Sequence, residues 1–275
     1  MIRRMETPDV PAAMRLKQAA GWNQTEQDWI NVLALEPEGC WVWEQDGQVV
    51  GTTTAVCYGQ ELAWIGMVLV LPEFRGQGIA RRLMEHSLEW LEARGVRQVK
   101  LDATDMGRQL YAKLGFRDER IIERWAGGRG LKFPRGLKPA PPSPAPPWLR
   151  HYDQETFGAD RSRLLARLVE TWPEQGVWRE PEGFLLGRPG SNYYFLGPGA
   201  ASSVASAEVL ARELLARAPA ENFFWDLFPD QPAMVELARR LGFERRRGLV
   251  RMALRPEMGA GRPERVFAAA GFEYG

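Results

Sequence analysis

The residue types that build disulfides and metal sites are scarce in this chain. It has only two cysteines and two histidines among 275 residues. Cys40 and Cys57 both lie in apolar stretches, so we expect no disulfide framework and interpret both as small buried hydrophobic residues. His86 and His151 have no partners at metal-ligand spacing, and we therefore predict no metal site.

An excess of charge and a long apolar run are also missing. Lys and Arg total 36 against 35 Asp and Glu, a net charge of +1, which argues against a global basic field for nucleic acid or anionic membranes. No run approaches the roughly 18 apolar residues of a membrane span. The first seven residues resemble a short strand more than a signal peptide. We expect a cytoplasmic globular protein with one large or two ordinary domains and no nucleic-acid or membrane partner.

What the chain does have is a glycine-rich turn between an apolar strand and an amphipathic helix. The strand ends at Pro72, the turn contains Arg75, Gly76, Gln77 and Gly78, and the helix opens with Ile79 and Ala80. Glycines leave backbone N–H groups uncovered, and a helix N-terminus adds unpaired N–H groups and a positive dipole end. The alternative is that the glycines only make a tight connection. The cation of Arg75, with Arg81 and Arg82 in the first helical turn, favours a phosphate.

Two other phosphate-binding motifs are excluded by spacing. The turn has no Gly-Lys-Ser/Thr, so it is not the loop that binds nucleoside triphosphates. It also lacks a GxGxxG followed by an acidic residue about 20 positions later, which a dinucleotide site requires.

Hydrophobic periodicity and turn signals predict a mixed α/β (α+β) unit around this turn. The expected order is β, α, α, β, β, β, α, β, α, β. The elements are a strand at Ile2–Met5, helices at 8–21 and 25–35, strands at 40–44, 49–58 and 62–70, a helix from Ala80 to Leu91, a strand at 98–103, a helix at 106–114 and a strand at 116–125.

After residue 126 the composition changes to a glycine- and proline-rich segment, 127–150, which includes nine residues from Pro139 to Pro147 with six prolines. Such a segment is extended and stiff, and we interpret it as a spacer, although proline-rich stretches can also be docking ligands. The predicted organisation is an N-terminal domain at 1–126, a linker at 127–150 and a second domain at 151–275.

The second half contains a concealed repeat of the first. A constant shift of 127 residues places Leu114-Gly115-Phe116 on Leu241-Gly242-Phe243, and it also aligns the apolar positions of the helix after the glycine turn. One offset that serves two helices and a strand indicates a duplicated fold. Under this shift residues 75–80 fall on 202–207, Ser-Ser-Val-Ala-Ser-Ala, without the cation or either glycine, and Tyr111 falls on Ala238. We therefore assign the activity to the first copy.

Residues 70–80 resemble the acetyl-CoA motif of GNAT superfamily N-acetyltransferases, and residues 110–116, Leu-Tyr-Ala-Lys-Leu-Gly-Phe, are similar to their second motif. The predicted element order also matches that superfamily. The resemblance covers roughly residues 1–126. Together with the repeat, it resembles a bacterial tandem type with two GNAT-like domains, each a mixed twisted sheet flanked by helices, of which the second is degenerate.

The resemblance implies a pose for acetyl-CoA as cosubstrate. Backbone groups of Val68, Leu69 and Val70 would pair with the pantetheine arm. The N–H groups of Arg75, Gly76, Gln77, Gly78, Ile79 and Ala80 would hold the pyrophosphate. Tyr111 stands where the family has a tyrosine that protonates the leaving thiolate. Seven positions earlier, where relatives often have asparagine, this chain has Thr104, which could still contact the pantetheine.

The acceptor side is less defined by the sequence. Glu61, Asp102 and Asp105 are candidate general bases, each equally a solvated or turn carboxylate, and a bound water is a further possibility. Trp22 lies in the region that often forms one wall of the acceptor site. Asp160 by default caps a helix, and alternatively contacts the acceptor.

The expected function is transfer of an acetyl group to a primary amine of a small molecule, by a monomer or homodimer. The alternatives are a protein lysine or N-terminal acetyltransferase, a non-catalytic acyl-CoA sensor, and a structural module whose glycine turn binds nothing.

Overall fold

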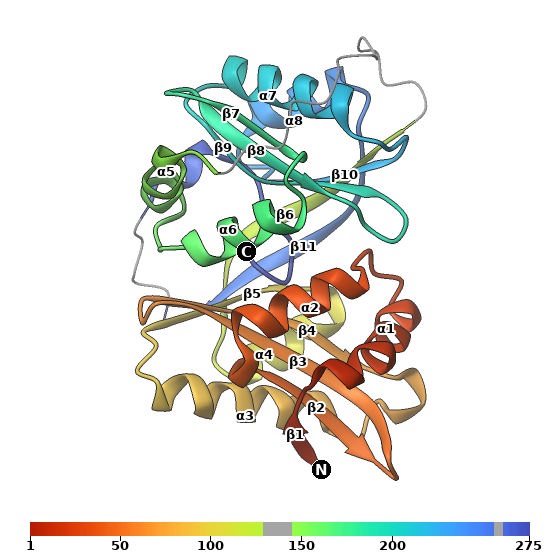
Figure 1. The fold of residues 1–275 in the computed structure, drawn as a ribbon. Helices are drawn as coiled ribbons and strands as arrows, with labels where there is room; N and C mark the ends of the chain where they lie inside the picture. The colour runs from red at the N-terminus through yellow and green to blue at the C-terminus, as the bar shows by residue number, and fades with distance from the viewer. Residues whose placement is uncertain (129–144, 256–260) are drawn as a thin grey trace. The chain divides into compact units, whose positions relative to one another are not determined.

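The computed structural model describes residues 1–128, 145–255 and 261–275 (Figure 1). The chain divides into two compact units, each a sheet with helices packed on it. The first contains Met1–Asp118, the end of the last long strand from Met252, and the segment Phe272–Gly275. The second contains Glu119–Arg251 and Met258–Gly271. This division differs from the predicted boundary at 126, since residues 119–126 fall in the second unit and residues 272–275 in the first.

The first unit follows the predicted order of elements. Its sheet runs β1-β2-β3-β4-β5, antiparallel except for β5, which is parallel to β4. The elements are β1 (Ile2–Arg4), η1 (Thr7–Asp9), α1 (Val10–Ala19), α2 (Glu26–Leu35), η2 (Pro37–Gly39), β2 (Cys40–Gln45), β3 (Gln48–Tyr58), β4 (Leu62–Val70), η3 (Pro72–Phe74), α3 (Ile79–Ala93), β5 (Gln98–Ala103) and α4 (Asp105–Lys113).

Helices cover the two faces of this sheet (Figure 1), with α3 on one face and α1 and α2 on the other. Gly51 of β3 faces α3, because a Cβ there would lie 3.0 Å from Ile79 and 3.2 Å from Leu83. Side chains alternate along a strand, so Thr54 and Tyr58 of β3 face α1 and α2. Their partners across the β3–β4 ladder are Gly66 and Leu62. Thr54 and Gly66 therefore lie on the face that α1 and α2 cover.

The second unit repeats the architecture. Its strand order is β6-β10-β9-β8-β7, and β12 pairs with β9 outside this path. The elements are β6 (Arg117–Gly127), α5 (Pro147–Phe157), α6 (Ser162–Thr171), β7 (Gly176–Arg179), β8 (Gly183–Arg188), β9 (Tyr194–Ala201), α7 (Val204–Arg217), β10 (Phe223–Leu227), α8 (Pro232–Arg240), β11 (Glu244–Leu254), η4 (Pro263–Arg265) and β12 (Val266–Ala268).

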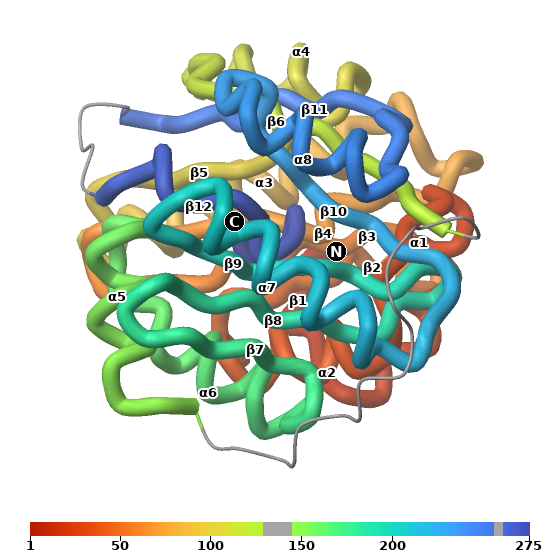
Figure 2. Tube along the Cα trace, turned by 90° about the horizontal axis from the view of Figure 1, so that it is seen from above, coloured from red at the N-terminus to blue at the C-terminus, as the bar shows by residue number. Residues whose placement is uncertain are grey.

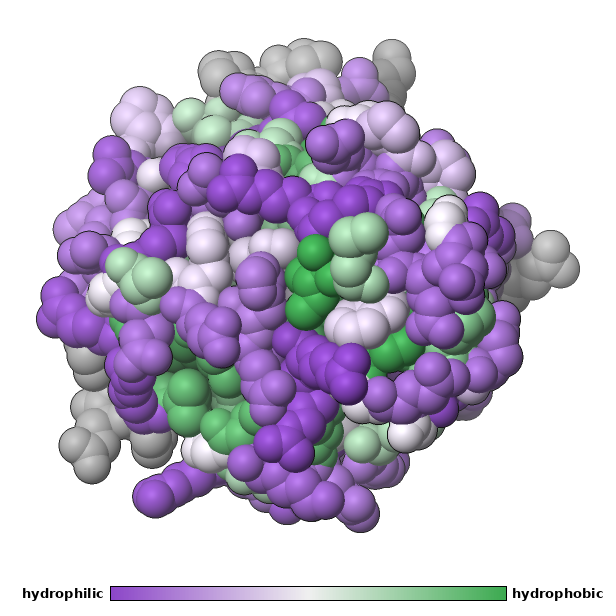
Figure 3. Space-filling view, turned by 90° about the horizontal axis from the view of Figure 1, so that it is seen from below, coloured by the Kyte–Doolittle hydropathy of each residue, from purple (hydrophilic) through white to green (hydrophobic). Residues whose placement is uncertain are grey.

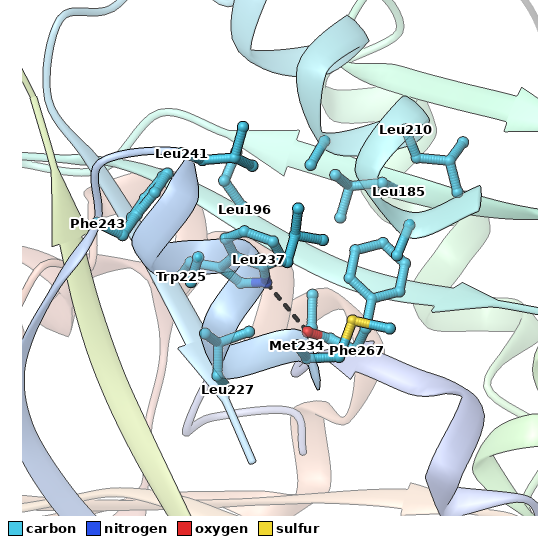
Figure 4. Close-up of a cluster of buried hydrophobic side chains, with 14 of the residues drawn as sticks. Leu185, Leu196, Leu210, Trp225, Leu227, Met234, Leu237, Leu241, Phe243 and Phe267 are labelled. Carbon is cyan, nitrogen blue, oxygen red and sulfur yellow. Dashed lines mark hydrogen bonds between the residues drawn. The ribbon is translucent and has the colours of Figure 1, made fainter. Parts of the chain in front are cut away.

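The duplicated fold inferred from the sequence is confirmed. Helix α8 and strand β11 begin and end 127 residues after α4 and β6. The core of the second unit is built from the positions that the shift aligns. It includes Leu210, Leu241 and Phe243, packed around Trp225, whose indole N–H donates to the carbonyl of Phe267 at 3.1 Å (Figure 4).

The predicted linker is only partly described. Gly127 ends β6, and residues 147–150 belong to α5. Pro147 is the first residue of α5, where a backbone N–H would make no hydrogen bond within the helix, so proline is tolerated there. Residues 129–144 lie outside the described part of the chain.

The described helices include none that is long and apolar enough to cross a bilayer. The face shown in Figure 3 is mostly hydrophilic, with small separate apolar patches. Isolated patches of this kind are ordinary on a protein surface.

Candidate functional site

Strand β4 carries a bulge next to a gap in the sheet. Thr52 pairs with Leu69 and Thr54 with Gly66, so two residues of β4, Met67 and Val68, lie opposite one residue of β3. Met67 has a φ of 50°, an unusual conformation for a side chain of this size. Such a bulge leaves backbone groups outside the ladder, and here they lie within the part of β4 predicted to meet the pantetheine.

On its other edge, β4 separates from β5. The two parallel strands pair only from Leu62–Gln98 to Trp64–Lys100. Beyond Trp64, the remaining residues of β4 pair with no described strand on that edge. Backbone N–H and C=O groups strongly require hydrogen-bond partners, so this edge is suited to an extended ligand that supplies them.

The second unit has the same separation, but its own chain fills it. Strands β9 and β10 pair only at residues 194–196 and 223–225. Beyond that point β12 pairs with β9 at Gly199 and Ala200, and Ala269 donates its N–H to the carbonyl of Asp226 in β10 (Figure 2). A Cβ at Gly197 would lie 1.9 Å from the carbonyl oxygen of Ala269. The second copy therefore has no room for a ligand along this edge.

The glycine turn follows β4 after the short helix η3. Gly76 and Gly78 both have φ of +77°, and a Cβ at either would meet no atom within 4 Å. The first backbone hydrogen bond of α3 is donated by Arg82 N–H to the carbonyl of Gly78 (3.1 Å). The N–H groups of Ile79, Ala80 and Arg81 precede it and have no partner within the helix. The turn is an open backbone cradle at the positive end of a helix of 15 residues.

In the second unit the corresponding helix start is closed by a side chain. Ser203 is the N-cap of α7, and its hydroxyl accepts a hydrogen bond from the N–H of Ser206 at 3.1 Å. Gly78 is the N-cap of α3 and has no side chain to do this. The helix start that a serine caps in one copy is therefore left uncapped, and open to a ligand, in the other.

The three arginines near the turn differ in their contacts. Arg75 is exposed and donates from Nε to the carbonyl of Val70 at 3.1 Å. Arg81 is paired with Glu85 at 2.7 Å, and Arg82 lies 5.4 Å from the ring centroid of Trp43. Arg75 lies within the turn itself, and its contact with β4 is a single hydrogen bond at the surface.

Tyr111 lies in α4 and is 8% exposed. Its ring folds back over Gly107, where a Cβ would lie 2.7 Å from the ring and 3.2 Å from the hydroxyl oxygen. Burial raises the pKa of the Tyr111 phenol above its ordinary value of 10. The side chain is therefore a neutral hydroxyl, able to donate a proton, at physiological pH.

Thr104 caps the helix that carries Tyr111. Its hydroxyl accepts the N–H of Gly107 at 3.3 Å. A hydroxyl can donate while it accepts, so the cap leaves its proton for a ligand.

The three carboxylates proposed as general bases differ in surroundings. Glu61 is half-buried, forms an ion pair with Arg97, and immediately precedes β4 at the end opposite the glycine turn. Asp105 is exposed in the first turn of α4. Asp102 lies half-buried in β5 and makes contacts of its own. Glu61 is separated from the turn by the nine residues of β4, or roughly 30 Å of strand.

Trp22 lies half-buried in the connection between α1 and α2, and its backbone N–H donates to the carbonyl of Lys17 at 3.1 Å. Trp41 and Trp64 are core residues, 2% and 0% exposed.

Two matches to acetyltransferase families cover most of the chain. Residues 6–116 match the Acetyltransferase (GNAT) family, and residues 149–268 match a second Acetyltransferase (GNAT) domain. The chain belongs to the GNAT acetyltransferase family. The two matches correspond to the two copies of the repeat, and the first contains the glycine turn and Tyr111. Acetyltransferases of this family use acetyl-CoA.

Two curated relatives are named as uncharacterized N-acetyltransferases. YitH of Bacillus subtilis is 24% identical over 181 residues, which cover 65% of this chain and 63% of the relative. A protein of Methanocaldococcus jannaschii is 28% identical over 113 residues, which cover 38% of this chain and 49% of the relative. The chain thus spans less than two thirds of either relative.

Two solved structures share the fold over nearly the whole chain. A putative acetyltransferase from Pyrococcus horikoshii has a TM-score of 0.84 at 22% identity and covers 100% of this chain and 95% of its own. A GCN5-related N-acetyltransferase from Sphaerobacter thermophilus has a TM-score of 0.66 at 19% identity, with 94% and 96% covered. At these identities the likeness shows the fold.

Sequence reasoning missed the segment Phe272–Gly275, which packs in the first unit and contains the buried Glu273. One signal was available. Gly66 is a glycine inside an otherwise apolar strand, a position that often marks the close approach of another backbone. A Cβ at Gly66 would lie 2.8 Å from the Cα of Glu273.

Asp160 has local partners in the second unit. It accepts the N–H of Ser162 at 2.9 Å, at the start of α6, and pairs with Arg150 at 2.7 Å. The hydrogen bonds from Ser162, with a further one from Arg150, hold the pKa of Asp160 below its usual value of 3.8 despite the opposing effect of partial burial. The next residue, Arg161, is buried and paired in bidentate fashion with Asp153.

These contacts predict a stability effect for Asp160. Asp160 is not the N-cap of α6, which is Arg161. We expect Asp160→Ala to lower the free energy of unfolding by about 1 kcal/mol, because its hydrogen bonds are lost, and Asp160→Asn to lower it less. Because the folded-state pKa is depressed, the contribution is present at neutral pH and disappears as the pH falls below about 3.8. Urea titrations at neutral and acidic pH measure this. A raised KM for the acceptor with unchanged stability would instead place Asp160 in the acceptor site.

Proposed function

We propose that this chain is an acetyl-CoA-dependent N-acetyltransferase whose active site lies in the first unit. The observation that carries the proposal is the unpaired edge of β4 beyond Trp64, directly before the glycine turn. The corresponding edge of β9 in the second copy is occupied by β12. The fold thus tolerates a closed edge, and an open one beside an anion cradle is best explained by a ligand.

In the proposed pose, acetyl-CoA extends along β4 like an added strand. Backbone groups of Val68, Leu69 and Val70 pair with the amides of the pantetheine arm. The pyrophosphate lies on the N–H groups of residues 75–80, and Arg75 turns from Val70 toward it. The hydroxyl of Thr104 provides a further contact to the pantetheine.

The reaction is direct attack of a neutral amine on the thioester carbonyl. The new C–N bond forms as the C–S bond breaks, the amine loses one proton, and the thiolate gains one. Backbone N–H groups at the β4 bulge polarise the carbonyl. Tyr111, kept neutral by burial, donates its proton to the departing thiolate.

The acceptor in this proposal is a primary amine of a small molecule. Trp22, on the connection between α1 and α2, forms one wall of its pocket. Polar groups on the side of the sheet that α1 and α2 cover are buried, among them Thr54 of β3 and Gln24 before α2, which suits a compact acceptor better than a long extended protein segment.

Thermal unfolding with acetyl-CoA, CoA or ATP tests the cosubstrate. We expect the melting temperature to rise with either CoA compound and to stay unchanged with ATP at equal concentration.

Release of free thiol across a panel of amines then tests catalysis. The panel contains small primary amines, amino acids, and peptides with a free N-terminus or lysine. Thiol release mainly with peptides would favour a protein acceptor, stabilisation by acetyl-CoA without thiol release would favour a sensor, and no stabilisation by a CoA compound would contradict the proposal.

A further inference from the structure

The segment Phe272–Gly275 is fixed on the α1 and α2 face of the first unit by a set of hydrogen bonds. The donors and acceptors are Trp64 Nε1 to Phe272 O (3.2 Å), Tyr58 Oη to Tyr274 O (2.7 Å), Tyr274 Oη to Asp28 O (3.3 Å) and Gln24 Nε2 to Glu273 Oε2 (2.8 Å). All four are buried, and they come from β3, β4, α2 and the connection before α2. The position of this segment is therefore defined by the first unit.

Glu273 lies directly over β4 close to the point where that strand separates from β5. The Cα and Cβ of Glu273 would lie 2.8 Å and 3.4 Å from a Cβ at Gly66. Gly66 precedes the bulge at Met67, and it comes two residues after Trp64, the last residue of β4 that pairs with β5. The glycine makes this close approach possible.

A second buried polar group belongs to the same place. Thr54 is the partner of Gly66 across the β3–β4 ladder and is fully buried. Its hydroxyl has no hydrogen-bond partner among the described residues. A buried hydroxyl without a hydrogen-bond partner is unfavourable. The position of Thr54 next to Gly66 points to a ligand that would supply this partner.

We propose that Glu273 is the carboxylate that receives the acceptor amine, and that it takes the proton which the ammonium form must lose before it attacks. This deepens the proposed acetyl transfer and rests on it. The donor enters from the α3 side, where the glycine turn lies, and its thioester reaches the gap between β4 and β5. The amine approaches the carbonyl from the opposite face, which carries Glu273 and Thr54.

The chemistry suits the position. A carboxylate attracts an ammonium group and takes one proton from it, which leaves the neutral nitrogen that attacks the thioester. The second proton, lost from nitrogen as the amide forms, balances the one that Tyr111 gives to the thiolate, and the proton on Glu273 passes to solvent. Glu273 is 1% exposed, so a small cation that reaches its carboxylate interacts with it away from bulk water, where the attraction is little screened. Gln24, which donates to it, holds the carboxylate in place while the neighbouring Trp22 bounds the pocket. Glu61, at the far end of β4, cannot serve the same carbonyl.

Glu273→Gln tests this role, since it keeps the shape and an oxygen that can accept from Gln24. With the best amine of the panel, we expect kcat/KM for the amine to fall about 100-fold or more, with an unchanged shift in melting temperature on addition of acetyl-CoA. Glu264→Gln, an exposed glutamate in the same part of the chain, is the control and should retain the activity of the parent protein. Retention of activity within threefold in Glu273→Gln would overturn the inference and leave the proposed function standing.

Gly66→Ala is a second variant, which leaves the carboxylate intact and pushes it away. The added methyl would lie 2.8 Å from Glu273 Cα and 3.2 Å from Phe272 O, so the segment has to move. We expect the KM for the amine to rise at least tenfold while acetyl-CoA still raises the melting temperature. An unchanged KM would contradict the inference. If the parent protein binds acetyl-CoA but releases no thiol with any amine, both the inference and the transfer reaction fail.

Discussion

Replacement of Tyr111 by phenylalanine is expected to lower kcat by about 100- to 1000-fold, the usual contribution of a positioned proton donor. The ring packs against Gly107 and, at a centroid distance of 6.2 Å, near Phe116, and phenylalanine preserves both contacts. The fold and the affinity for acetyl-CoA should therefore be unaffected. The measurement is steady-state thiol release at saturating acetyl-CoA and amine.

Tyr152→Phe is the matched control. This substitution also removes one hydroxyl, which in the parent protein donates to the carbonyl of Glu182 at 3.3 Å in the second unit. No loss of activity is expected. Burial raises the pKa of Tyr111, so its phenol stays protonated up to at least pH 10 and should produce no alkaline limb in kcat below that pH. Equal kcat in Tyr111→Phe and the parent protein would show that another group protonates the thiolate.

A single methyl group on Gly78 is expected to weaken acetyl-CoA binding at least tenfold, or about 1.4 kcal/mol. A Cβ at this position points into open space, which in the proposed pose belongs to the pyrophosphate. The left-handed φ of +77° adds a strain of roughly 1 kcal/mol for alanine, which also disturbs the N–H groups of the cradle. Isothermal titration of Gly78→Ala with acetyl-CoA measures the loss.

Gly47 offers a control that separates strain from binding. It lies between β2 and β3 with a φ of +75°, and a Cβ there would also meet no atom within 4 Å. Gly47→Ala should lower the stability by a similar amount and bind acetyl-CoA like the parent protein. A similar affinity in the two variants would remove the cradle from the binding site.

The two copies of the fold differ at the helix start and at the sheet edge. In the second copy Ser203 caps the helix and β12 completes the sheet edge. In the first copy both positions are left open. A fold that closes these groups in one copy does not need them open for stability in the other, and a bound ligand accounts for the difference.

The sequence by itself determined the local elements and the cradle. The glycine turn, the amphipathic α3 and the hairpin of β2 and β3 depend on residues close together in the chain, where backbone conformation and hydrophobic period act directly. The offset of 127 residues also predicted a second copy of the fold, because equivalent core positions keep the same spacing in both copies.

Only the tertiary structure decided what surrounds the cradle. The pairing of β12 with β9 and the packing of Glu273 on Gly66 join residues far apart in the chain. Neither contact leaves a periodic pattern, because a short segment is positioned by the groups that it meets and not by its own propensity. Gly66 was a local sign of the Glu273 contact, and it shows that a backbone approaches without showing which residue does so.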